Sequence, residues 1–420
     1  MRVLYSVLWC LGLPLVLARL WWRGRKEPGY REYWGERLGF YGPRMAAPLT
    51  LWVHAVSVGE TRAAEPLVDA LLAAWPDSRI VLTHMTPTGR ATGRALFAKH
   101  GARLVQSYLP YDLTPLVRRF IGHFQPRVCI LMETEVWPNL IAACGAQVPV
   151  ALVNARLSER SLRRGHRFGS LLSDAARGIT LVAAQTEADA LRIRAMGAPK
   201  VEVTGSIKFD VVVPAAALDT GAWLRHRSGP RAVLLCASTR DGEETLILEA
   251  WSRRPASLGN ALLIIVPRHP QRFDDVAALV QARGLSLQRR SQLAEDDISA
   301  QVLLGDSMGE MFAYYAACDL AFIGGSLLPL GGQNLIEACA LGKPVLIGPY
   351  TFNFALVTEQ AIAAGGASCV ADEQDLLEQA ARLLGDAAER AAMGARAYQF
   401  AHQHRGATLR TVEMLRHLIY

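Results

Sequence analysis

A glycine-rich segment in the last third of the chain has the spacing of a site for a phosphorylated ligand. The glycine pairs Gly324–Gly325 and Gly331–Gly332 follow the apolar run Ala321–Ile323. Glycine has no Cβ atom, so the backbone can approach a ligand closely there. Asn334 is predicted to open a helix whose first N–H groups suit an anion, and Glu337 can reach a hydroxyl pair such as that of a ribose. The segment predicts a nucleotide site, although glycine-rich turns also occur without a ligand.

A carboxylate near the start of another predicted helix is a candidate for proton transfer. The predicted strand Leu51–Ser57 ends just before Glu60. Ser57 and Glu60 have the spacing of a capping box, while Gly59 permits a close approach that a cap does not need. The helix dipole should keep Glu60 ionised, and an ionised carboxylate can accept a proton from an attacking hydroxyl group. From the spacing alone, both a helix cap and a general base remain open.

Paired acids and two cations on loops could complete a reaction site. Glu133 and Glu135 follow the predicted strand Arg127–Met132, and paired acids rarely end a buried strand for packing reasons. They could orient an acceptor or stabilise a cationic, sugar-like transition state; alternatively, Glu133 caps the next helix and Glu135 faces solvent. Lys208 and Arg268 could neutralise a departing phosphate or be ordinary surface cations.

The segment 305–309 raises a competing function. It reads Gly-Asp-Ser-Met-Gly, the G-x-S-x-G pattern of a hydrolase nucleophile elbow centred on Ser307. An α/β serine hydrolase would then need Asp319 with a downstream histidine, His402 or His404, but Asp319 begins the next predicted strand and so lies at its wrong end. In the other interpretation, a phosphate binds the backbone N–H groups of Gly309, Glu310 and Met311.

Composition limits the partners. The chain has 420 residues, 51% of them hydrophobic and 20% charged, a net charge of +7 and a pI near 9.1. A basic protein of this kind favours an anionic partner. It lacks a basic motif interleaved with aromatic residues, so we expect an anionic lipid or a nucleotide and no nucleic acid. No Walker A, G-x-G-x-x-G, H-E-x-x-H or D-x-D pattern occurs, and therefore no metal is implied. The seven scattered cysteines indicate reduced thiols in a cytosolic compartment.

The N-terminus predicts membrane attachment. Residues 3–18 carry no charge, and a basic, tryptophan-rich segment, Arg19–Lys26, follows them. A signal peptide would need a small-residue cleavage site, and Leu17-Ala18-Arg19 is a poor one. The apolar run is slightly short for a full span, so a tilted anchor or an in-plane helix fits better. The basic flank suits the cytoplasmic leaflet.

Strands alternate with helices along the rest of the chain, which predicts two parallel sheets covered on both faces. A Pro-, Ala- and Gly-containing stretch at 213–229 interrupts the alternation and is predicted to be a linker. The expected architecture is two tandem Rossmann-like domains facing a cleft, preceded by a membrane-associating helix. The boundaries are 1–26 for the anchor, 27–212 for the first domain and 230–420 for the second, whose final helix is free to pack back on the first.

These motifs together resemble the 3-deoxy-D-manno-octulosonate (Kdo) transferases of lipopolysaccharide synthesis over nearly the whole chain. The matching segments are Trp21–Lys26, His54–Glu60, Thr86–Gly89, Tyr108–Asp112, Met132–Glu135, Asn154–Leu157, Thr204–Asp210, Pro267–Pro270, Gly305–Met311 and Gly348–Asn353.

The resemblance implies an inverting glycosyltransferase of the two-Rossmann (GT-B) type, with CMP-Kdo as donor and no metal or other cofactor. The acceptor would be a lipid A precursor, lipid IVA, bound by the first domain at the cytoplasmic face of the inner membrane. Glu60 resembles the catalytic base, and Glu133 and Lys208 resemble the groups that stabilise the transition state. The segments that resemble CMP contacts are Arg268 and His269, then Gly309, Glu310 and Met311, then Asn334, Leu335, Ile336 and Glu337.

The glycine loop departs from the family pattern at one position. The family typically has Gly-Gly-His-Asn, and this chain has Gln333 in place of the histidine. Glutamine can donate or accept a hydrogen bond but carries no charge near neutral pH. A role that needs an imidazolium at this position is therefore not expected of this chain.

Overall fold

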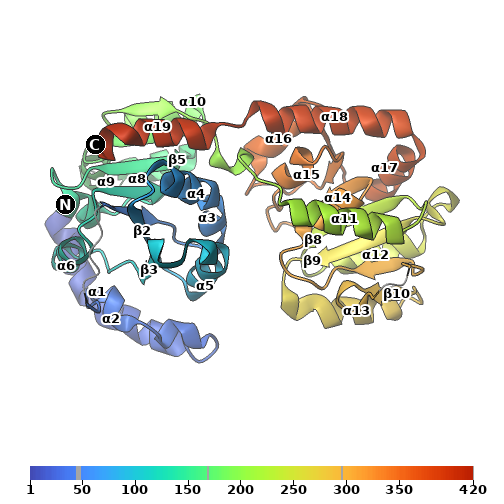
Figure 1. Cartoon of the computed structure of the whole chain (residues 1–420), viewed down its shortest axis with the longest axis horizontal. Coiled ribbons are helices and arrows are strands. Elements are labelled where there is room, and N and C mark those ends of the chain that lie inside the picture. Colours follow the sequence, from blue (N-terminus) through green and yellow to red (C-terminus); the bar gives the residue numbers. More distant parts are fainter. Residues whose placement is uncertain (44–48, 168–169, 295–296, 420) are drawn as a thin grey trace. The chain divides into compact units, whose positions relative to one another are not determined.

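Two parallel sheets of seven strands each organise the chain (Figure 1). The computed structural model describes residues 1–43, 49–167, 170–294 and 297–419. The chain divides into two units: unit 1 comprises Met1–Asp210 and Arg405–Tyr420, and unit 2 comprises Val211–His404. Both units are α/β folds with parallel sheets, as the alternation of strands and helices predicts.

The sheet of unit 1 has the strand order β3-β2-β1-β4-β5-β6-β7. Its strands are β1 (Leu49–His54), β2 (Ser78–His84), β3 (Leu104–Tyr108), β4 (Val128–Met132), β5 (Val150–Ala155), β6 (Leu181–Ala184) and β7 (Val201–Val203). The helices of unit 1 are α1 (Arg2–Arg23), α2 (Trp34–Arg37), α3 (Val58–Ala63), α4 (Glu65–Ala74), α5 (Pro87–Leu96), α6 (Thr114–Phe124), α7 (Pro138–Cys144), α8 (Glu159–Arg167), α9 (Ser170–Arg177), α10 (Glu187–Ala195) and α19 (Ala407–Ile419).

The sheet of unit 2 has the order β10-β11-β9-β8-β12-β13-β14. Its strands are β8 (Val233–Thr239), β9 (Leu262–Pro267), β10 (Leu287–Arg289), β11 (Val302–Leu304), β12 (Leu320–Ile323), β13 (Val345–Ile347) and β14 (Ala367–Cys369). Its helices are α11 (Ala215–Arg227), α12 (Glu243–Ser252), α13 (Phe273–Gln281), α14 (Met311–Ala317), α15 (Ile336–Ala340), α16 (Ala355–Ala363), α17 (Glu373–Gly385) and α18 (Ala387–Gln403).

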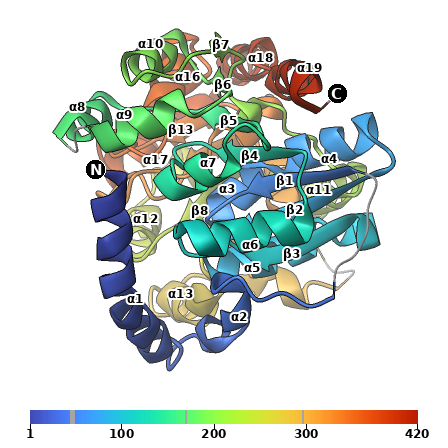
Figure 2. The same cartoon turned by 90° about the vertical axis from the view of Figure 1, so that its left-hand side faces the viewer.

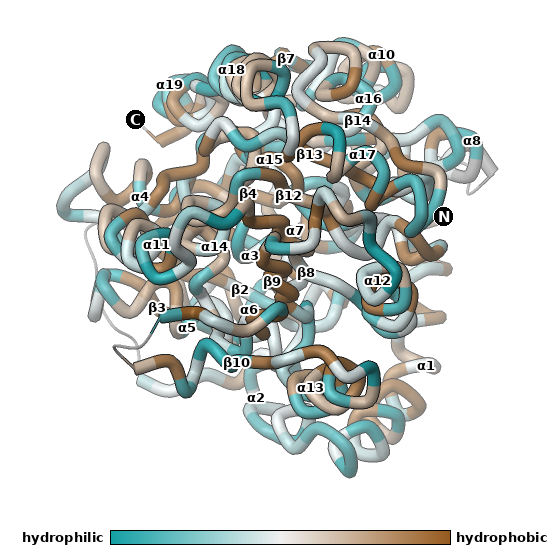
Figure 3. The backbone as a smooth tube through the Cα atoms, turned by 90° about the vertical axis from the view of Figure 1, so that its right-hand side faces the viewer, coloured by the Kyte–Doolittle hydropathy of each residue, from teal (hydrophilic) through white to brown (hydrophobic). Residues whose placement is uncertain are grey.

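The strands are almost continuously apolar because helices cover both faces of each sheet. In β1, successive side chains point to opposite faces, so Leu51 and Val53 join one hydrophobic core and Trp52 joins the other. The central strands of unit 2, such as β8 and β9, likewise consist mainly of hydrophobic, buried residues (Figure 3). The cores thus hold the carboxyl ends of the strands, and the loops that follow them, in fixed positions.

In each sheet the chain winds outward in both directions from a central pair of strands. The pair is β1 and β4 in unit 1, and β8 and β12 in unit 2. Ligands of open parallel sheets bind beyond the carboxyl ends of strands at such a switch point. The loops after these four strands are therefore the places to look for a site.

The expectation of a linker over 213–229 is wrong for most of that stretch. Residues 215–227 form α11, which belongs to unit 2. Its alanines favour a helix, and Gly221, interpreted as a break, is a packing residue. A Cβ atom at Gly221 would collide with the side chain of Ala316 in α14.

After unit 2 the chain returns to unit 1, and the last helix, α19, belongs to unit 1. Asp210 accepts hydrogen bonds from the N–H groups of Gly406 (2.6 Å) and Thr408 (2.5 Å) at the start of α19. Val412, Leu415 and Ile419 of α19 lie in the core cluster that also contains Leu51 and Val53 of β1. The final helix therefore completes the hydrophobic core of unit 1.

Candidate active site

Two predicted site residues from distant parts of the sequence, Glu133 and Lys208, meet at the carboxyl edge of the unit 1 sheet. Glu133 directly follows β4. Its carboxylate forms an ion pair with the Lys208 ammonium at 2.7 Å. It also pairs with the guanidinium of Arg156, just after β5, at 3.1 Å. The side chain of Glu133 is only 6% exposed, and a buried carboxylate of this kind requires such partners.

The alternative roles for the paired acids do not hold. Glu133 does not cap α7, because Asp112 accepts hydrogen bonds from the N–H groups of Asn139 (3.1 Å) and Leu140 (2.7 Å). Glu135 is half-buried rather than free in solvent, and Trp137 donates a hydrogen bond to it at 2.9 Å. Burial raises the pKa of Glu135 above its ordinary value.

Glu133 adopts an uncommon backbone conformation, with φ of 54°. A non-glycine residue in the left-handed region is strained by about 1–2 kcal/mol. The two ion pairs and the N–H bond from Glu133 to the carbonyl of Val153 (2.9 Å) hold it there. Strain held in this way is characteristic of functional sites.

Glu60 is both a helix-cap residue and a carboxylate with a shifted pKa. Its N–H group donates to Ser57 Oγ at 3.4 Å, and its Oε2 accepts the N–H of Val56 at 2.8 Å. Burial raises its pKa to about 7, assisted by the charges of Glu135 and Glu133 and opposed by the Val56 hydrogen bond and Lys208. Burial therefore acts against the expectation that the helix dipole keeps Glu60 ionised, because a pKa of about 7 leaves the carboxylate only partly ionised near neutral pH.

One residue that positions Lys208 was not singled out from the sequence. Asn154, near the end of β5, is fully buried with φ of 51°. Its side-chain oxygen accepts the N–H of Ile207 at 3.1 Å, which orients the short 3-10 helix η3 (Ile207–Phe209) that carries Lys208. Its Nδ2 has no hydrogen-bond partner among the described residues. The sequence signal was an asparagine at the end of an apolar strand.

The glycine loop of unit 2 follows β12 and is folded on itself. The N–H of Gly332 donates to the carbonyl of Gly325 (2.6 Å), and the N–H of Gln333 donates to that of Gly324 (3.0 Å). Gly325, Gly331 and Gly332 have φ of 71°, 94° and 74°, a region that favours glycine. The two glycine pairs thus form one compact turn at the switch point of the sheet.

Glu243, at the start of α12, anchors this loop and was missed in the sequence. It is fully buried, and its carboxylate accepts four backbone N–H groups: those of Arg240 (2.9 Å), Gly325 (2.5 Å), Ser326 (2.9 Å) and Leu327 (2.9 Å). A carboxylate is an acceptor at both oxygens, which suits a turn whose N–H groups all point inward. The only sequence signal was an acidic residue in the first turn after a strand.

Basic side chains follow β8, which pairs with β12, and β9, which lies on the other side of β8. Arg268 and His269 come directly after β9, and Arg240 comes directly after β8. Burial together with the charges of Arg240 and Arg268 lowers the pKa of His269. The side chain of Arg240 lies against Gly325, since a Cβ atom there would be 3.5 Å from Arg240 Cγ. Arg240 is therefore a further candidate for anion binding that the sequence analysis did not name.

The helix after the glycine loop begins later than predicted. It starts at Ile336 rather than Asn334, and the Asn334 side chain accepts the N–H of Ile336 at 3.0 Å. The Asn334 amide donates to Glu337 at 3.1 Å, which places both polar side chains together. Leu335 and Ile336 are fully buried, so neither residue presents an exposed side chain to a ligand.

The segment at 305–311 does not form a hydrolase site. The Ser307 hydroxyl contacts Glu310 (2.5 Å) and Tyr314 (2.6 Å), and no histidine is among its recorded partners in the described chain. Asp319 pairs with Arg225 at 3.1 Å at the beginning of β12, away from the carboxyl edge of the sheet. Glu310 itself pairs with Arg290 at 2.8 Å, while Gly309 and Met311 lead into α14.

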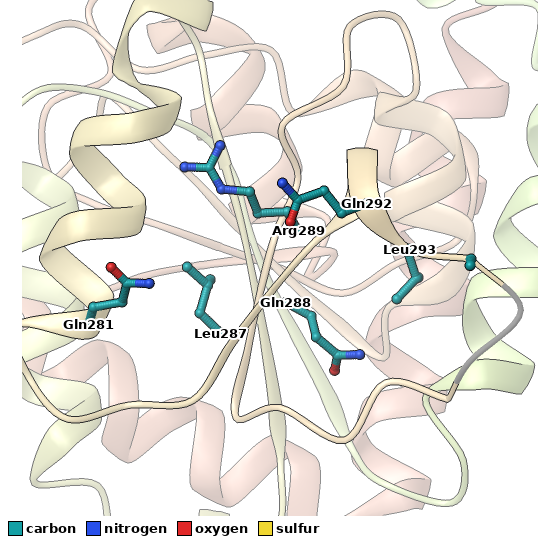
Figure 4. Close-up of a pocket in the computed structure, with 7 residues that line it drawn as sticks. Gln281, Leu287, Gln288, Arg289, Gln292 and Leu293 are labelled. Atoms are coloured by element: carbon teal, nitrogen blue, oxygen red, sulfur yellow. The ribbon is translucent and has the colours of Figure 1, made fainter.

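Two pockets deserve comparison. The one in Figure 4 has a volume of about 240 Å³ and lies beside β10. None of the predicted donor-binding residues lines it, and its Arg289 is already paired with Asp274 at 2.7 Å. The other lies in unit 1, is largely apolar and includes Glu133 and Arg156 in its wall. The described residues include no group of histidine, cysteine and acidic side chains arranged for a metal ion.

The N-terminal helix α1 lies against unit 1 (Figure 2). Tyr5 donates a hydrogen bond to Asp112 at 2.9 Å, and Ser6 and Asn139 are hydrogen-bonded at 3.0 Å. In the described part of the chain, α1 is the one helix long and apolar enough to cross a membrane. Its exposed apolar side chains include Val3, Leu4, Val7, Leu8, Leu11 and Leu15, with Trp21 and Trp22 near its end.

The fold and the positions of these groups define a class, the GT-B type with two Rossmann-like domains. A UDP-N-acetylglucosamine 2-epimerase from Neisseria meningitidis has a TM-score of 0.58 at 17% identity, covering 87% of this chain and 99% of that one. A glycosyltransferase from Rickettsia africae has a TM-score of 0.57 at 11% identity, covering 88% and 98%. These likenesses concern the fold alone.

Sequence comparison narrows the class to a family. Residues 32–211 match the family described as 3-deoxy-D-manno-octulosonic-acid transferase. A transferase of that name from Bordetella pertussis is 47% identical over 413 residues, 96% of each chain. One from Haemophilus influenzae is 37% identical over 421 residues, 99% of this chain and 98% of its own. The chain belongs to the Kdo transferase family of glycosyltransferases.

Proposed function

We propose that this chain transfers Kdo from CMP-Kdo to a lipid A precursor, lipid IVA, with inversion at the anomeric carbon and without a metal. The observation that carries the proposal is a half-buried Glu60 with a pKa of about 7 beside the Glu133–Lys208 ion pair. A general base is most effective when its pKa lies near the working pH. Charged groups that are already fixed in position can stabilise the charge that develops in the transition state of a sugar transfer.

In the proposed reaction, Glu60 accepts the proton of an acceptor hydroxyl group. The oxygen forms a bond to the anomeric carbon of Kdo, and the bond from that carbon to the phosphate oxygen breaks. CMP leaves with the electron pair. Glu133 and Lys208 stabilise the developing charge on the sugar and its carboxylate.

Unit 2 would bind the donor. Arg268, with Arg240 from the neighbouring strand end, would neutralise the phosphate of CMP. The backbone of the loop before α14 would also contact it, and Asn334 and Glu337 would hold the ribose. His269 lies beside the two arginines that lower its pKa, so it would contribute as a neutral hydrogen-bonding group.

The N-terminal helix would keep the acceptor end of the molecule at the cytoplasmic face of the inner membrane. Its exposed apolar side chains suit the hydrocarbon, and its basic flank suits anionic lipid headgroups. Reversing the charges of Arg23, Arg25 and Lys26 should lower activity on vesicles more than on detergent-dispersed acceptor. Equal losses in both would argue against this role.

The direct test is transfer from CMP-Kdo, generated in situ, to tetra-acylated lipid A precursor, with the product read by mass. We expect product from the wild type and a rate about 10²–10⁴-fold lower for Glu60→Ala. Glu65→Ala, which removes another glutamate from the first turn of a helix, is the matched control and should retain activity. Denaturant unfolding checks that each variant is folded.

Undiminished transfer by Glu60→Ala would reduce Glu60 to a helix cap. No product from the wild type would overturn the assignment of donor or acceptor.

A further inference from the structure

An apolar pocket inside unit 1 opens next to the proposed reacting groups. Its volume is about 290 Å³. It lies between the ends of β4 and β5 and the helices α8, α9 and α10. The lining residues are Glu133, Thr134, Val136, Leu152, Arg156, Leu157, Ser161, Gly165, Leu172, Ala176, Ile179, Ile193 and Met196.

The wall of this pocket has a large apolar part and a smaller polar part. Leu152, Ile179 and Met196 are buried aliphatic or thioether side chains, and none of the described lining residues carries an aromatic ring. Polar groups are confined to Ser161 and to the segments at the ends of β4 and β5, where Glu133 pairs with Arg156. A ligand that fits would be aliphatic along most of its bound length and polar at one end.

Exposed arginines lie at the pocket and on α8. Arg156 lines it with 48% of its side chain exposed, and Arg160 and Arg163 of the neighbouring α8 are also exposed. The pair of Arg163 with Glu159, at 3.7 Å between two exposed side chains, contributes little. The side chains of Arg164 and Arg167, two further arginines of α8, lie outside the described residues. The described arginines complement an anionic headgroup.

We propose that this pocket binds an aliphatic chain of the acceptor, an acylated amphiphile whose anionic headgroup contacts the arginines of α8 and the end of β5. The inference rests on the proposed function and adds the part of the acceptor that this site recognises. The aliphatic side chains of the described lining suit a hydrocarbon chain better than a stacked base or sugar. The volume, at the low end of ligand pockets, suits part of one hydrocarbon chain. The polar end of the chain then lies beside Glu133, where the acceptor hydroxyl must be presented.

Filling the pocket tests this directly. Ala176→Leu places added carbon atoms in the lumen, whereas Ala195→Leu makes the same change at an exposed position of α10 outside the lining. Each methylene group displaced from an apolar site should cost about fourfold in affinity. We therefore expect Ala176→Leu to raise KM at least about tenfold for the fully acylated acceptor. It should leave kcat, and KM for a de-acylated acceptor, near wild type.

Leu172→Ser provides a second variant in case Ala176→Leu fails to fold. Leu172 lies on a half-exposed turn of α9. Serine at this position makes the wall of the pocket polar and should reduce the preference for the acylated over the de-acylated acceptor. If both variants impair the two acceptors equally, or impair neither, the pocket does not recognise an acyl chain.

A binding measurement separates this inference from the transfer reaction. Dodecyl phosphate, titrated calorimetrically below its micellar concentration into the full chain, should bind more tightly than dodecyl maltoside and should be weakened by Ala176→Leu but not by Ala195→Leu. If this pattern appears without any Kdo transfer, the pocket stands and the proposed function falls. If transfer proceeds while dodecyl phosphate shows no such preference, the proposed function stands and the inference falls.

Discussion

At the scale of single residues, burial and neighbouring charges act against each other on Glu60. Burial, Glu135 and Glu133 raise its pKa, while the N–H of Val56 and the Lys208 ammonium lower it, and the balance is about 7. Lys208 is held in place by Glu133 at 2.7 Å. The same ion pair therefore stabilises charge in the proposed reaction and adjusts the protonation of the proposed base.

The pH dependence of the reaction should report this balance. A base is active when ionised, so kcat/KM should rise with pH through a midpoint near 7. Lys208→Met removes a charge that lowers the pKa of Glu60, and its midpoint should move to higher pH as well as its rate falling. Lys200→Met, at an exposed position, is the control. Pre-steady-state rates between pH 5 and 9 would check this, and an unchanged midpoint in Lys208→Met would contradict it.

Glu60 should also reduce stability at high pH. Its native pKa of about 7 is above the ordinary value of 4.5, so between these values the native state holds a proton that the unfolded state has released. Stability is therefore lost as pH rises through this window. Glu60→Gln should be more stable than the wild type at pH 8, with the difference disappearing near pH 4.5. Denaturant unfolding at both pH values measures it, and a variant less stable at pH 8 would contradict the expectation.

At the scale of elements, one buried carboxylate organises the glycine loop. Glu243 at the start of α12 binds the N–H groups of Gly325, Ser326 and Leu327, which follow β12. These hydrogen bonds join the loop to the start of the helix. Donor binding by the glycine loop would depend on a residue that need not touch the donor.

Glu243→Gln keeps the shape of the side chain but replaces one acceptor oxygen by an N–H donor. Because buried N–H groups then lose their partner, we expect a stability loss of about 1–3 kcal/mol and at least tenfold weaker CMP binding. Glu249→Gln, on the exposed face of the same helix, should change neither. Calorimetric CMP titration and denaturant unfolding measure both effects. Wild-type CMP affinity in Glu243→Gln would show that the loop does not depend on this anchor.

At the scale of the whole chain, the C-terminal helix completes the first unit. The chain passes through unit 2 and returns, so that α19 contributes Val412, Leu415 and Ile419 to the core around β1. Asp210, where unit 1 first ends, caps the start of α19. Unit 1 is therefore incomplete until the last residues have been added.

Two leucines of α19 allow the contribution of core packing to stability to be distinguished from that of helix propensity. Leu415 is fully buried, while Leu409 is 72% exposed. We expect Leu415→Ala to destabilise the protein by about 2–5 kcal/mol and Leu409→Ala by less than about 0.5 kcal/mol. Hydrogen exchange should speed up in β1 and α4 for Leu415→Ala and stay unchanged in the strands of unit 2. Faster exchange confined to unit 2 would contradict the assignment of α19 to unit 1.

Local patterns in the sequence determined the alternation of strands and helices, the glycine turn after β12, and the capping pair Ser57 and Glu60. These features depend on the hydrophobic periodicity and the backbone sterics of a few neighbouring residues. Both can be read from the sequence itself. The same locality explains the error over α11, where Gly221 looks like a break until its neighbour Ala316 is known.

Only the tertiary structure decided which distant side chains meet. The order of the strands places Lys208 and Arg156 against Glu133 and gives Glu243, rather than any nearby residue, the N–H groups of the glycine loop. It also determines the burial that moves the pKa of Glu60 to about 7, against the expectation from its helix position. Ion pairing and desolvation depend on what surrounds a group in space, and a single sequence does not contain those distances.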